Sequence, residues 1–308
     1  MGSVVGLVRT QYSFESIRKS ISDALNLINF NMDSSIKSVV IKPNLCYYWD
    51  AATGQTTHPQ VVAAAIDIVR EKCGENVNIK VAEADASAMR TKYAFKILGY
   101  EKLSKEKNVE LFNLSNDILV EKVVNMGKRK ISFQVPQLLL NCDLFINVAN
   151  LKIMRETKIT CAMKNVFGCI GSPRKVVYHP FLDEAIVGIN RVLRPHLTIV
   201  DGLVAWGRFP VKLGLIMAST DPFSVDWIAS QIMGYKPTKV RFLKIAMKEK
   251  LGNPKGITPK GISLAEFKEI FPKANFTSSN YWWHFQSWLL KVYCKMADDV
   301  IPPALEEA

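Results

Sequence analysis

The sequence lacks the glycine-rich motifs by which several common enzyme classes are recognised. None of the patterns G-x-x-x-x-G-K-[ST], G-x-G-x-x-G or G-x-S-x-G occurs in its 308 residues. These segments cradle phosphates, bind dinucleotides or present a nucleophilic serine. Their absence disfavours the common nucleotide hydrolases, nicotinamide dehydrogenases and serine hydrolases.

Cysteine pairs, histidine pairs and long apolar runs are also missing. The six cysteines include no C-x-x-C pair, and no two of the four histidines have the spacing of a zinc motif. No apolar run approaches the ~18 residues that span a membrane. Residues 1–10 lack the basic start and the long apolar stretch of a secretory signal. We therefore expect a cytoplasmic protein with free thiols and no transmembrane segment.

The composition is that of a folded, basic protein. Hydrophobic residues make up 48% of the chain and charged residues 22%, which is enough for a packed core. The net charge of +12 favours an anionic partner: a nucleotide, a phosphorylated or carboxylated metabolite, a nucleic acid or a membrane surface. Much of the excess lies between Lys236 and Lys273.

Four apolar, strand-like runs each end abruptly in charged or amide residues. The polar ends of these runs are Lys42-Pro43-Asn44, Glu83-Ala84-Asp85, Asn150-Leu151-Lys152 and Asp201-Gly202. In an open α/β sheet, ligands bind outside the carboxyl ends of the parallel strands. If the four runs belong to one sheet, their polar ends surround a single cleft.

The order of the predicted elements indicates an α/β fold. A strand at 38–41, a helix at about 59–73 and a strand at 77–82 predict parallel pairing by a right-handed crossover. Thr57 and Gln60 have capping-box spacing, and Pro59 fits the first helical turn. Residues 118–124 and 130–135 predict an inserted β-hairpin on a sheet edge. We expect a mostly parallel sheet with helices on both faces, this hairpin and a helical C-terminal extension.

A change in composition near residue 236 suggests two parts. We expect residues 1–235 to form the α/β ligand-binding domain and residues 236–308 a basic, aromatic-rich helical extension. In this extension, Tyr281 to Met296 places most of its aromatic residues on one helical face. That face can pack on the body, join two copies in a homodimer or meet a membrane interface.

The segment from Leu151 to Gly168 is the richest in candidate binding groups. Thr157 has the position of a helix cap, and Lys158, Lys164 and Asn165 follow at helix-compatible spacing. Lysines beside a helix N-terminus form an anion site. The alternative is a solvent-exposed basic helix, which the interleaved apolar residues disfavour.

The charged residues at the strand ends are the candidate catalytic groups. Lys42 can hold an anion as a point charge, act as a base if burial lowers its pKa, or simply reach out to water. Glu83 and Asp85 are expected to face one side of an extended segment, where paired carboxylates share a proton or bind a cation. His58 is an alternative proton carrier. Turn formation or capping is the competing role for Asp85 and Asp201.

The same carboxylates are the candidate ligands of a divalent cation, although the sequence leaves the cofactor unknown. They are Glu83, Asp85, Asp201 and Asp221. Asp221 is followed by Pro222, the pattern of a helix cap, so a structural role competes with metal binding there.

Six short motifs resemble, in their order, those of the domain-of-unknown-function family 362 over about residues 38–235. They are Ile41-Lys42-Pro43-Asn44, Thr56-Thr57-His58-Pro59, Asn150-Leu151-Lys152, Thr160-x-x-x-Lys164-Asn165-x-x-Gly168-Cys169, Leu197-Thr198-Ile199-Val200-Asp201-Gly202 and Thr220-Asp221-Pro222. Many members look like iron–sulfur proteins because they append a ferredoxin-type module. The resemblance therefore implies an iron–sulfur cluster only through a module that we do not find in this sequence.

The central segment departs from the family pattern. Members usually read lysine-threonine-histidine, whereas Lys152 is followed here by Ile153 and Met154. Proton transfer through that histidine is therefore not expected. The segment is also loosely similar to lactate racemase-type enzymes, which use a nickel-containing nucleotide derivative.

The leading hypothesis is an enzyme, of a reaction we do not name, that acts on an anionic small molecule at the carboxyl edge of the sheet. The expected substrate-binding residues are Asn44, Thr57, Lys152, Thr157, Lys158, Lys164 and Asn165, and the expected catalytic residues are Lys42, His58, Glu83, Asp85 and Asp201. The alternatives are a nucleic-acid-binding protein that uses its basic C-terminal region and an iron–sulfur-linked electron-transfer protein.

Overall fold

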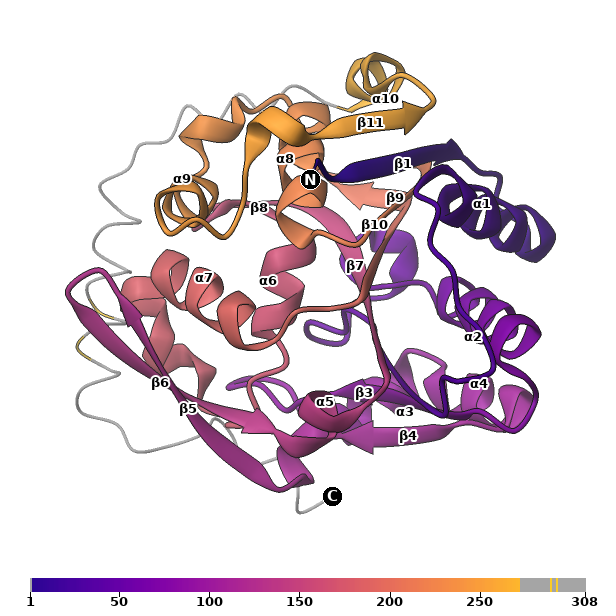
Figure 1. Ribbon diagram of the computed structural model, residues 1–308, viewed down its shortest axis with the longest axis horizontal. Coiled ribbons are helices and arrows are strands. Elements are labelled where there is room, and N and C mark those ends of the chain that lie inside the picture. Colours follow the sequence, from indigo (N-terminus) through magenta and orange to yellow (C-terminus); the bar gives the residue numbers. More distant parts are fainter. Residues whose placement is uncertain (1, 272–288, 290–291, 293–308) are drawn as a thin grey trace.

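The computed structural model describes residues 2–271 together with residues 289 and 292. Within this part of the chain, one nine-stranded sheet has the order β11-β1-β10-β9-β7-β2-β3-β4, with β8 paired to β7 (Figure 1). Its strands are β1 (Val4–Arg9), β2 (Ser38–Lys42), β3 (Asn78–Glu83), β4 (Glu110–Asn113), β7 (Leu144–Met154), β8 (Lys158–Thr160), β9 (Leu197–Trp206), β10 (Pro210–Ser219) and β11 (Thr258–Gly261).

The helices of the described residues connect these strands. They are α1 (Phe14–Leu27), α2 (Pro59–Cys73), α3 (Thr91–Ile97), α4 (Tyr100–Lys107), α5 (Gln137–Asn141), α6 (Ala162–Phe167), α7 (Leu182–Val192), α8 (Pro222–Ile232), α9 (Arg241–Lys248) and α10 (Leu264–Ile270). Short 3-10 turns occur at Ala51–Thr53, Leu114–Asn116, Lys175–Phe181, Pro237–Lys239 and Pro254–Gly256.

The centre of the sheet is parallel, as the sequence predicted. Strands β4, β3, β2, β7 and β9 all run in one direction, and β10 and β1 follow as antiparallel neighbours. Ile41 of β2 lies opposite Val81 of β3 and Ile146 of β7. Because β2, β3, β7 and β9 are parallel, Lys42 and Glu83 at the ends of β2 and β3 lie toward the same edge of the sheet as Lys152 and Asp201. The strands predicted to end at Val148 and Val200 are longer, so Lys152 and Asp201 lie inside β7 and β9.

Helices cover both faces of the sheet, so the fold has three layers with a core on each side. Figure 1 shows α1, α2 and α4 on one side and α6, α7 and α9 on the other. On α1, Ile17, Ile21 and Ala24 are buried at the helical spacing that faces a core. The two separate clusters of buried apolar residues confirm the predicted α/β class with helices on both faces.

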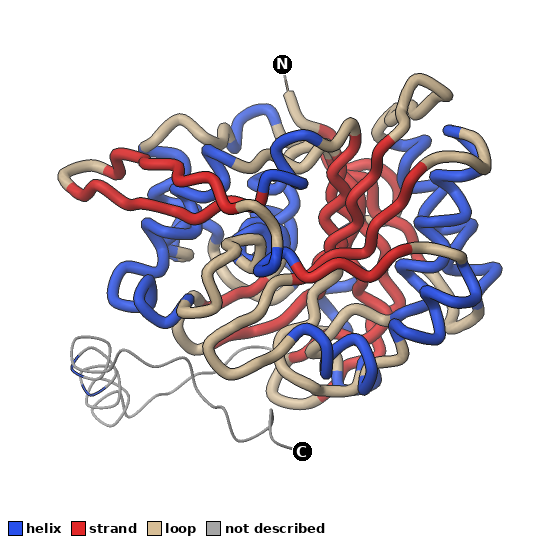
Figure 2. Tube along the Cα trace, turned by 90° about the horizontal axis from the view of Figure 1, so that it is seen from below, coloured by secondary structure: helices blue, strands red, loops and turns tan. Residues whose placement is uncertain are grey.

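The predicted hairpin is present but does not extend the main sheet. Strands β5 (Leu119–Met126) and β6 (Arg129–Pro136) form a sheet of their own, which projects from the body (Figure 2). Gly127 has a φ of +59° at the tip, the left-handed conformation that a tight hairpin turn requires. Phe133 is buried, and a Cβ at Gly188 of α7 would lie only 3.0 Å from its ring. The hairpin therefore packs against α7 instead of a sheet edge.

The predicted helix beginning at Thr157 is wrong. Strand β7 continues to Met154, and β8 returns antiparallel beside it, pairing Lys152 with Thr160 and Ile153 with Ile159. The Thr157 hydroxyl donates to the Ile159 carbonyl at 2.8 Å, so it closes the turn and does not cap a helix. β-Branched residues favour this strand pair.

The start of α2 also differs in detail from the prediction. Pro59 occupies the first helical position as expected, but the capping residue is His58, whose Nδ1 accepts from the Gln60 backbone N–H at 3.2 Å. Thr57 instead accepts from the Asn44 N–H at 2.9 Å and donates to the Val148 carbonyl at 3.1 Å. Thr57 thus ties the loop after β2 to β7.

Residues 236–271 contribute to the same core as the rest of the sheet. Strand β11 pairs in parallel with β1, and Phe242, Leu243 and Phe267 are buried in one of the two apolar clusters. The division at residue 236 stays a prediction.

Apart from residues 289 and 292, the aromatic helix predicted over 281–296 lies outside the described residues. No helix among the described residues is long and apolar enough to cross a membrane.

Candidate active site

A buried ion pair joins the carboxyl ends of β2 and β3. The Lys42 ammonium lies 2.9 Å from Oε2 of Glu83, and only 1% and 4% of these residues are exposed. Glu83 also accepts from the backbone N–H groups of Leu45, at 3.1 Å, and Ala84, at 3.0 Å. Glu83 therefore links the end of β3 to the start of the loop that follows β2.

The Lys42 ammonium has as many partners as it has protons. Besides Glu83, it donates to the Pro43 carbonyl at 2.8 Å and to Oδ1 of Asn165 at 3.1 Å. A Cβ at Gly168 would lie 3.0 Å from Nζ and Cε of Lys42, so a larger residue here would press on the lysine. With three bonds in place, Lys42 holds neighbouring groups in position and has no proton left for a ligand.

Asn165 of α6 is the centre of an amide network. Its Oδ1 accepts from Lys42 and from Asn44, and its Nδ2 donates to Oδ1 of Asn147 at 2.8 Å. Asn147 donates in turn to the Thr198 hydroxyl at 3.3 Å. This network connects α6 with the end of β2, with Asn147 inside β7 and with Thr198 near the start of β9, and it brings Asn165 and Asn44 together.

Lys152 is a second buried lysine, and it has donor capacity to spare. It donates to Oδ1 of Asn44 and to the Gln55 carbonyl, both at 2.6 Å, and is 3% exposed. An ammonium has three protons, so one is left after these two bonds. Burial, with a smaller contribution from the charges of Lys164 and Lys42, lowers the pKa of Lys152 to about 8.

Two buried oxygen atoms beside Lys152 have no hydrogen-bond partner among the described residues. They are Oδ1 of Asn150 and Oγ1 of Thr160. Thr160 lies directly opposite Lys152 in the β7–β8 pair, and Asn150 is two residues before Lys152 on β7. The pairing puts Thr160 on the face of the strand pair that carries Lys152, and Asn150 lies close by along β7, where the pairing with β9 is irregular. Buried polar atoms without partners are rare, and they mark places where a water, an ion or a ligand can bind.

Asp201 and His58 form a second group at the same edge. Oδ2 of Asp201 accepts from the His58 backbone N–H at 2.7 Å, and Oδ1 accepts from the Leu203 N–H at 3.0 Å. Burial raises the pKa of Asp201 to about 6 against the effect of these two bonds. Burial likewise lowers the pKa of His58. Asp201 is the register partner of Asn150, which places this group next to the Lys152 side of the edge.

Several of the predicted residues lie away from this cluster. Asp85 does not pair with Glu83, because it accepts from the Thr91 N–H at 2.7 Å and from Asn113 at 3.2 Å. Lys158 has a φ of +68° and donates to the Lys239 carbonyl at 2.9 Å.

Lys164 and Asp221 are the two remaining residues predicted to belong to the site. Lys164 is half-buried and is near enough to Lys152 to influence its pKa. Asp221 caps α8, as its sequence pattern predicted, by accepting from the Phe223 and Ser224 N–H groups. The four carboxylates proposed as metal ligands are thus engaged with different partners. Among the described residues, no three or more His, Cys, Asp or Glu side chains are grouped to hold a metal ion.

Sequence reasoning missed two buried charged groups that contact the two ends of α6. Lys175 donates to the Gly168 carbonyl at 2.8 Å, and burial lowers its pKa to about 8. Asp226 of α8 accepts from the Ala162 and Met163 N–H groups at the start of α6, at 2.6 and 3.0 Å, and burial raises its pKa to about 7. No apolar run ends at Lys175, and Asp226 lies inside a helix, so neither residue follows the strand-end pattern.

A known family matches the central strands of the sheet together with this cluster. The model of DUF362, a domain of unknown function, matches residues 39–231. The chain belongs to the DUF362 family. The match includes Lys42, Glu83, Lys152 and Asp201, and it ends within α8.

One curated relative and two solved structures are similar to the chain. A thylakoid-associated protein of Synechocystis sp. is 26% identical over 81% of this chain and 80% of its own length. A Thermotoga maritima protein shares 13% identity with a TM-score of 0.39, over 61% of this chain and 50% of that one. The lactate racemase apoprotein of Thermoanaerobacterium thermosaccharolyticum shares 11% identity with a TM-score of 0.43, over 75% of this chain and 57% of that one. The chain thus spans little more than half of these solved structures. The cytoplasmic location expected from the sequence stays a prediction.

Proposed function

We propose that the protein is an enzyme that binds an anionic small molecule at the carboxyl edge of its sheet, next to Lys152. The observation that carries this proposal is the spare proton of a buried lysine beside two buried oxygen atoms without described partners, Asn150 Oδ1 and Thr160 Oγ1. The substrate class is a carboxylated, phosphorylated or nucleotide-like molecule. The reaction is not specified by these contacts.

Lys152 is the group proposed to contact the ligand. With a pKa of about 8, it is mostly protonated at pH 7 and attracts an anion, yet it can release its proton without a large free-energy cost. Lysine serves as a catalytic acid or base when burial lowers its pKa in this way. Asp201, with a pKa of about 6, is a second candidate for proton transfer at the same edge.

Lys42, Glu83, Asn44 and Asn165 are proposed as positioning residues. Lys42 has no proton left. Asn44 donates to Asn165 and accepts from Lys152, while Asn165 accepts from Lys42 and donates to Asn147. Their network fixes the rotamer of Lys152 through Asn44. A rigid supporting network of this kind is what holds a reactive group in a productive geometry.

The test compares Lys152 with Lys158, since the sequence predicted both lysines to bind the substrate. Phosphate, pyrophosphate, citrate and adenosine monophosphate are titrated by calorimetry into the parent and into Lys152→Gln and Lys158→Gln variants that retain the parent circular dichroism spectrum. A charge-assisted hydrogen bond contributes about 1.5–3 kcal/mol, so Lys152→Gln is expected to weaken binding about 10- to 100-fold. Lys158→Gln, which removes the same charge outside the cluster, is expected to change it less than about twofold.

The proposal fails if none of these anions binds the parent saturably, or if both variants weaken binding equally. Equal weakening would show that the net positive charge, and not the site at Lys152, attracts the anions.

A further inference from the structure

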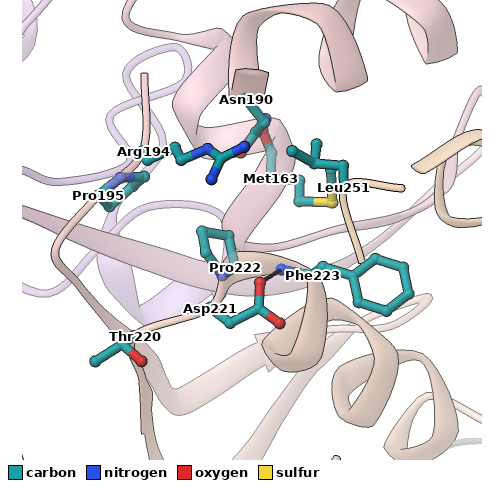
Figure 3. Close-up of a pocket in the computed structure, with 9 residues that line it drawn as sticks. All are labelled: Met163, Asn190, Arg194, Pro195, Thr220, Asp221, Pro222, Phe223 and Leu251. Carbon is teal, nitrogen blue, oxygen red and sulfur yellow. Dashed lines mark hydrogen bonds between the residues drawn. The ribbon is translucent and has the colours of Figure 1, made fainter. Parts of the chain in front are cut away.

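A small pocket lies at the opposite edge of the sheet from Lys152. Thr220 follows the end of β10 and Pro195 precedes β9, and both residues line the pocket (Figure 3). Since β10 and β9 are antiparallel, the end of β10 and the start of β9 lie at the same edge, which is the amino edge of the parallel strands. The pocket has a volume of about 230 Å³. It is therefore a separate site from the carboxyl-edge cluster.

Arg194 supplies the positive charge of this pocket. Its side chain is exposed, and within residues 2–271 it makes no hydrogen bond or ion pair. Figure 3 shows the guanidinium reaching along one side of the pocket toward Asn190. A guanidinium has five N–H donors in a planar fork, and here all of them are available for a ligand.

Asn190 and Asp221 have most of their hydrogen-bonding capacity in use. Asn190 donates both amide hydrogens, to the Met163 and Ile186 carbonyls at 2.9 and 2.8 Å. Asp221 accepts from two N–H groups at the start of α8 and from the hydroxyls of Ser3 and Ser224. The helix start thus compensates the charge of Asp221, so the pocket offers one uncompensated charge, that of Arg194.

The remaining walls are largely apolar. Met163 of α6, Phe223 of α8 and Leu251 after α9 face the side of the pocket away from Pro195 (Figure 3). A volume of about 230 Å³ is below the range of about 300–1,000 Å³ that is usual for larger ligands. A single guanidinium suits a monoanion, and a carboxylate matches its fork with two parallel hydrogen bonds.

We propose that this pocket binds a small monocarboxylate with a short apolar body. The carboxylate pairs with Arg194, and the apolar part contacts Met163, Phe223 and Leu251. This inference does not depend on the function proposed for Lys152, because the two sites lie at opposite edges of the sheet. A nucleotide is too large for the pocket, and a dianionic phosphate would leave one of its charges without a partner.

The experiment uses n-butyrate as the probe and n-butyramide as its uncharged analogue. Each is titrated into the isotope-labelled full chain, and binding is followed by the amide NMR shifts of residues 163, 190, 194, 221, 223 and 251. Butyrate is expected to move these signals saturably, whereas butyramide is expected to bind at least about tenfold more weakly, because it lacks the charge that pairs with the guanidinium.

Three variants test the assignment. Arg194→Gln is expected to weaken butyrate binding about tenfold, and Lys96→Gln, which removes one exposed positive charge on α3, is expected to leave it unchanged. Thr220→Trp places a large side chain at the exposed rim and is expected to block binding without disturbing the core. Absence of saturable butyrate binding in the parent, equal binding of butyramide, or equal effects of Arg194→Gln and Lys96→Gln would each overturn the proposal.

Discussion

Replacing Lys42 by methionine tests whether the carboxyl edge is built around a charged pair. Methionine keeps the length of the side chain but removes the ammonium, so Glu83 stays buried without its counter-charge. Breaking a buried ion pair by removing one partner destabilises a protein by about 3–5 kcal/mol. In Lys42→Met, the Pro43 carbonyl and Oδ1 of Asn165 also lose a donor.

Two contacts of Glu83 moderate this loss. Its carboxylate keeps the Leu45 and Ala84 N–H groups, and Asn165 Oδ1 keeps its bond from Asn44. We therefore expect the lower part of the range, about 3 kcal/mol, in the free energy of unfolding. Urea denaturation at pH 7, followed by circular dichroism, measures this quantity.

Lys158→Met is the matched control. Lys158 is an exposed lysine, so its replacement is expected to change the free energy of unfolding by less than about 0.5 kcal/mol. A Lys42→Met variant within about 1 kcal/mol of the parent would refute the reasoning, because it would show that Glu83 does not need the ammonium in the folded state.

Three further predictions concern titration and helix capping. The pKa of Asp226 rises from 3.8 to about 7 in the fold, so this group stabilises the protein at low pH, and its contribution is lost as the pH rises from about 4 to 7. Asp226→Asn is expected to remove this pH dependence from the free energy of unfolding. An unchanged pH dependence would contradict the assignment. The carbon-13 shift of Lys152 Cε is expected to titrate near pH 8, and a midpoint above about 10 would show that burial does not act as described. His58→Ala removes the cap of α2 and is expected to lower the free energy of unfolding by about 0.5–2 kcal/mol, while His58→Asn retains most of it; an equal loss in both variants would exclude capping.

The carboxyl edge could be predicted because its strands carry local signals. An apolar run that ends in Lys42 or Glu83 indicates both a buried strand and the place where it ends. Parallel pairing then brings such ends together without any knowledge of the contacts between them. The pattern selects only residues at the ends of the apolar runs, so it missed Asn147, which lies inside one of them.

The segment after Lys152 could not be predicted from helical spacing. Lys158, Lys164 and Asn165 fit one helix in the sequence, but Lys158 lies in the left-handed region and begins a three-residue strand. The stability of that strand comes from its pairing with β7, a non-local interaction that residue spacing does not report. Tertiary pairing therefore overrides the local pattern here.

The buried Lys42–Glu83 ion pair can serve either the stability of the fold or the binding site. Replacing a buried ion pair by apolar residues of similar volume is often neutral or stabilising, so stability alone does not favour the pair. The double variant Lys42→Met, Glu83→Gln removes both charges and keeps a side-chain oxygen for the backbone N–H groups of Leu45 and Ala84, so it is expected to unfold with a higher free energy than Lys42→Met alone. If the pair instead serves the site, this stable variant loses anion binding, because Asn44 and Asn165 no longer hold Lys152 in place. A double variant that is both stable and fully competent to bind would remove the pair from the proposed active site.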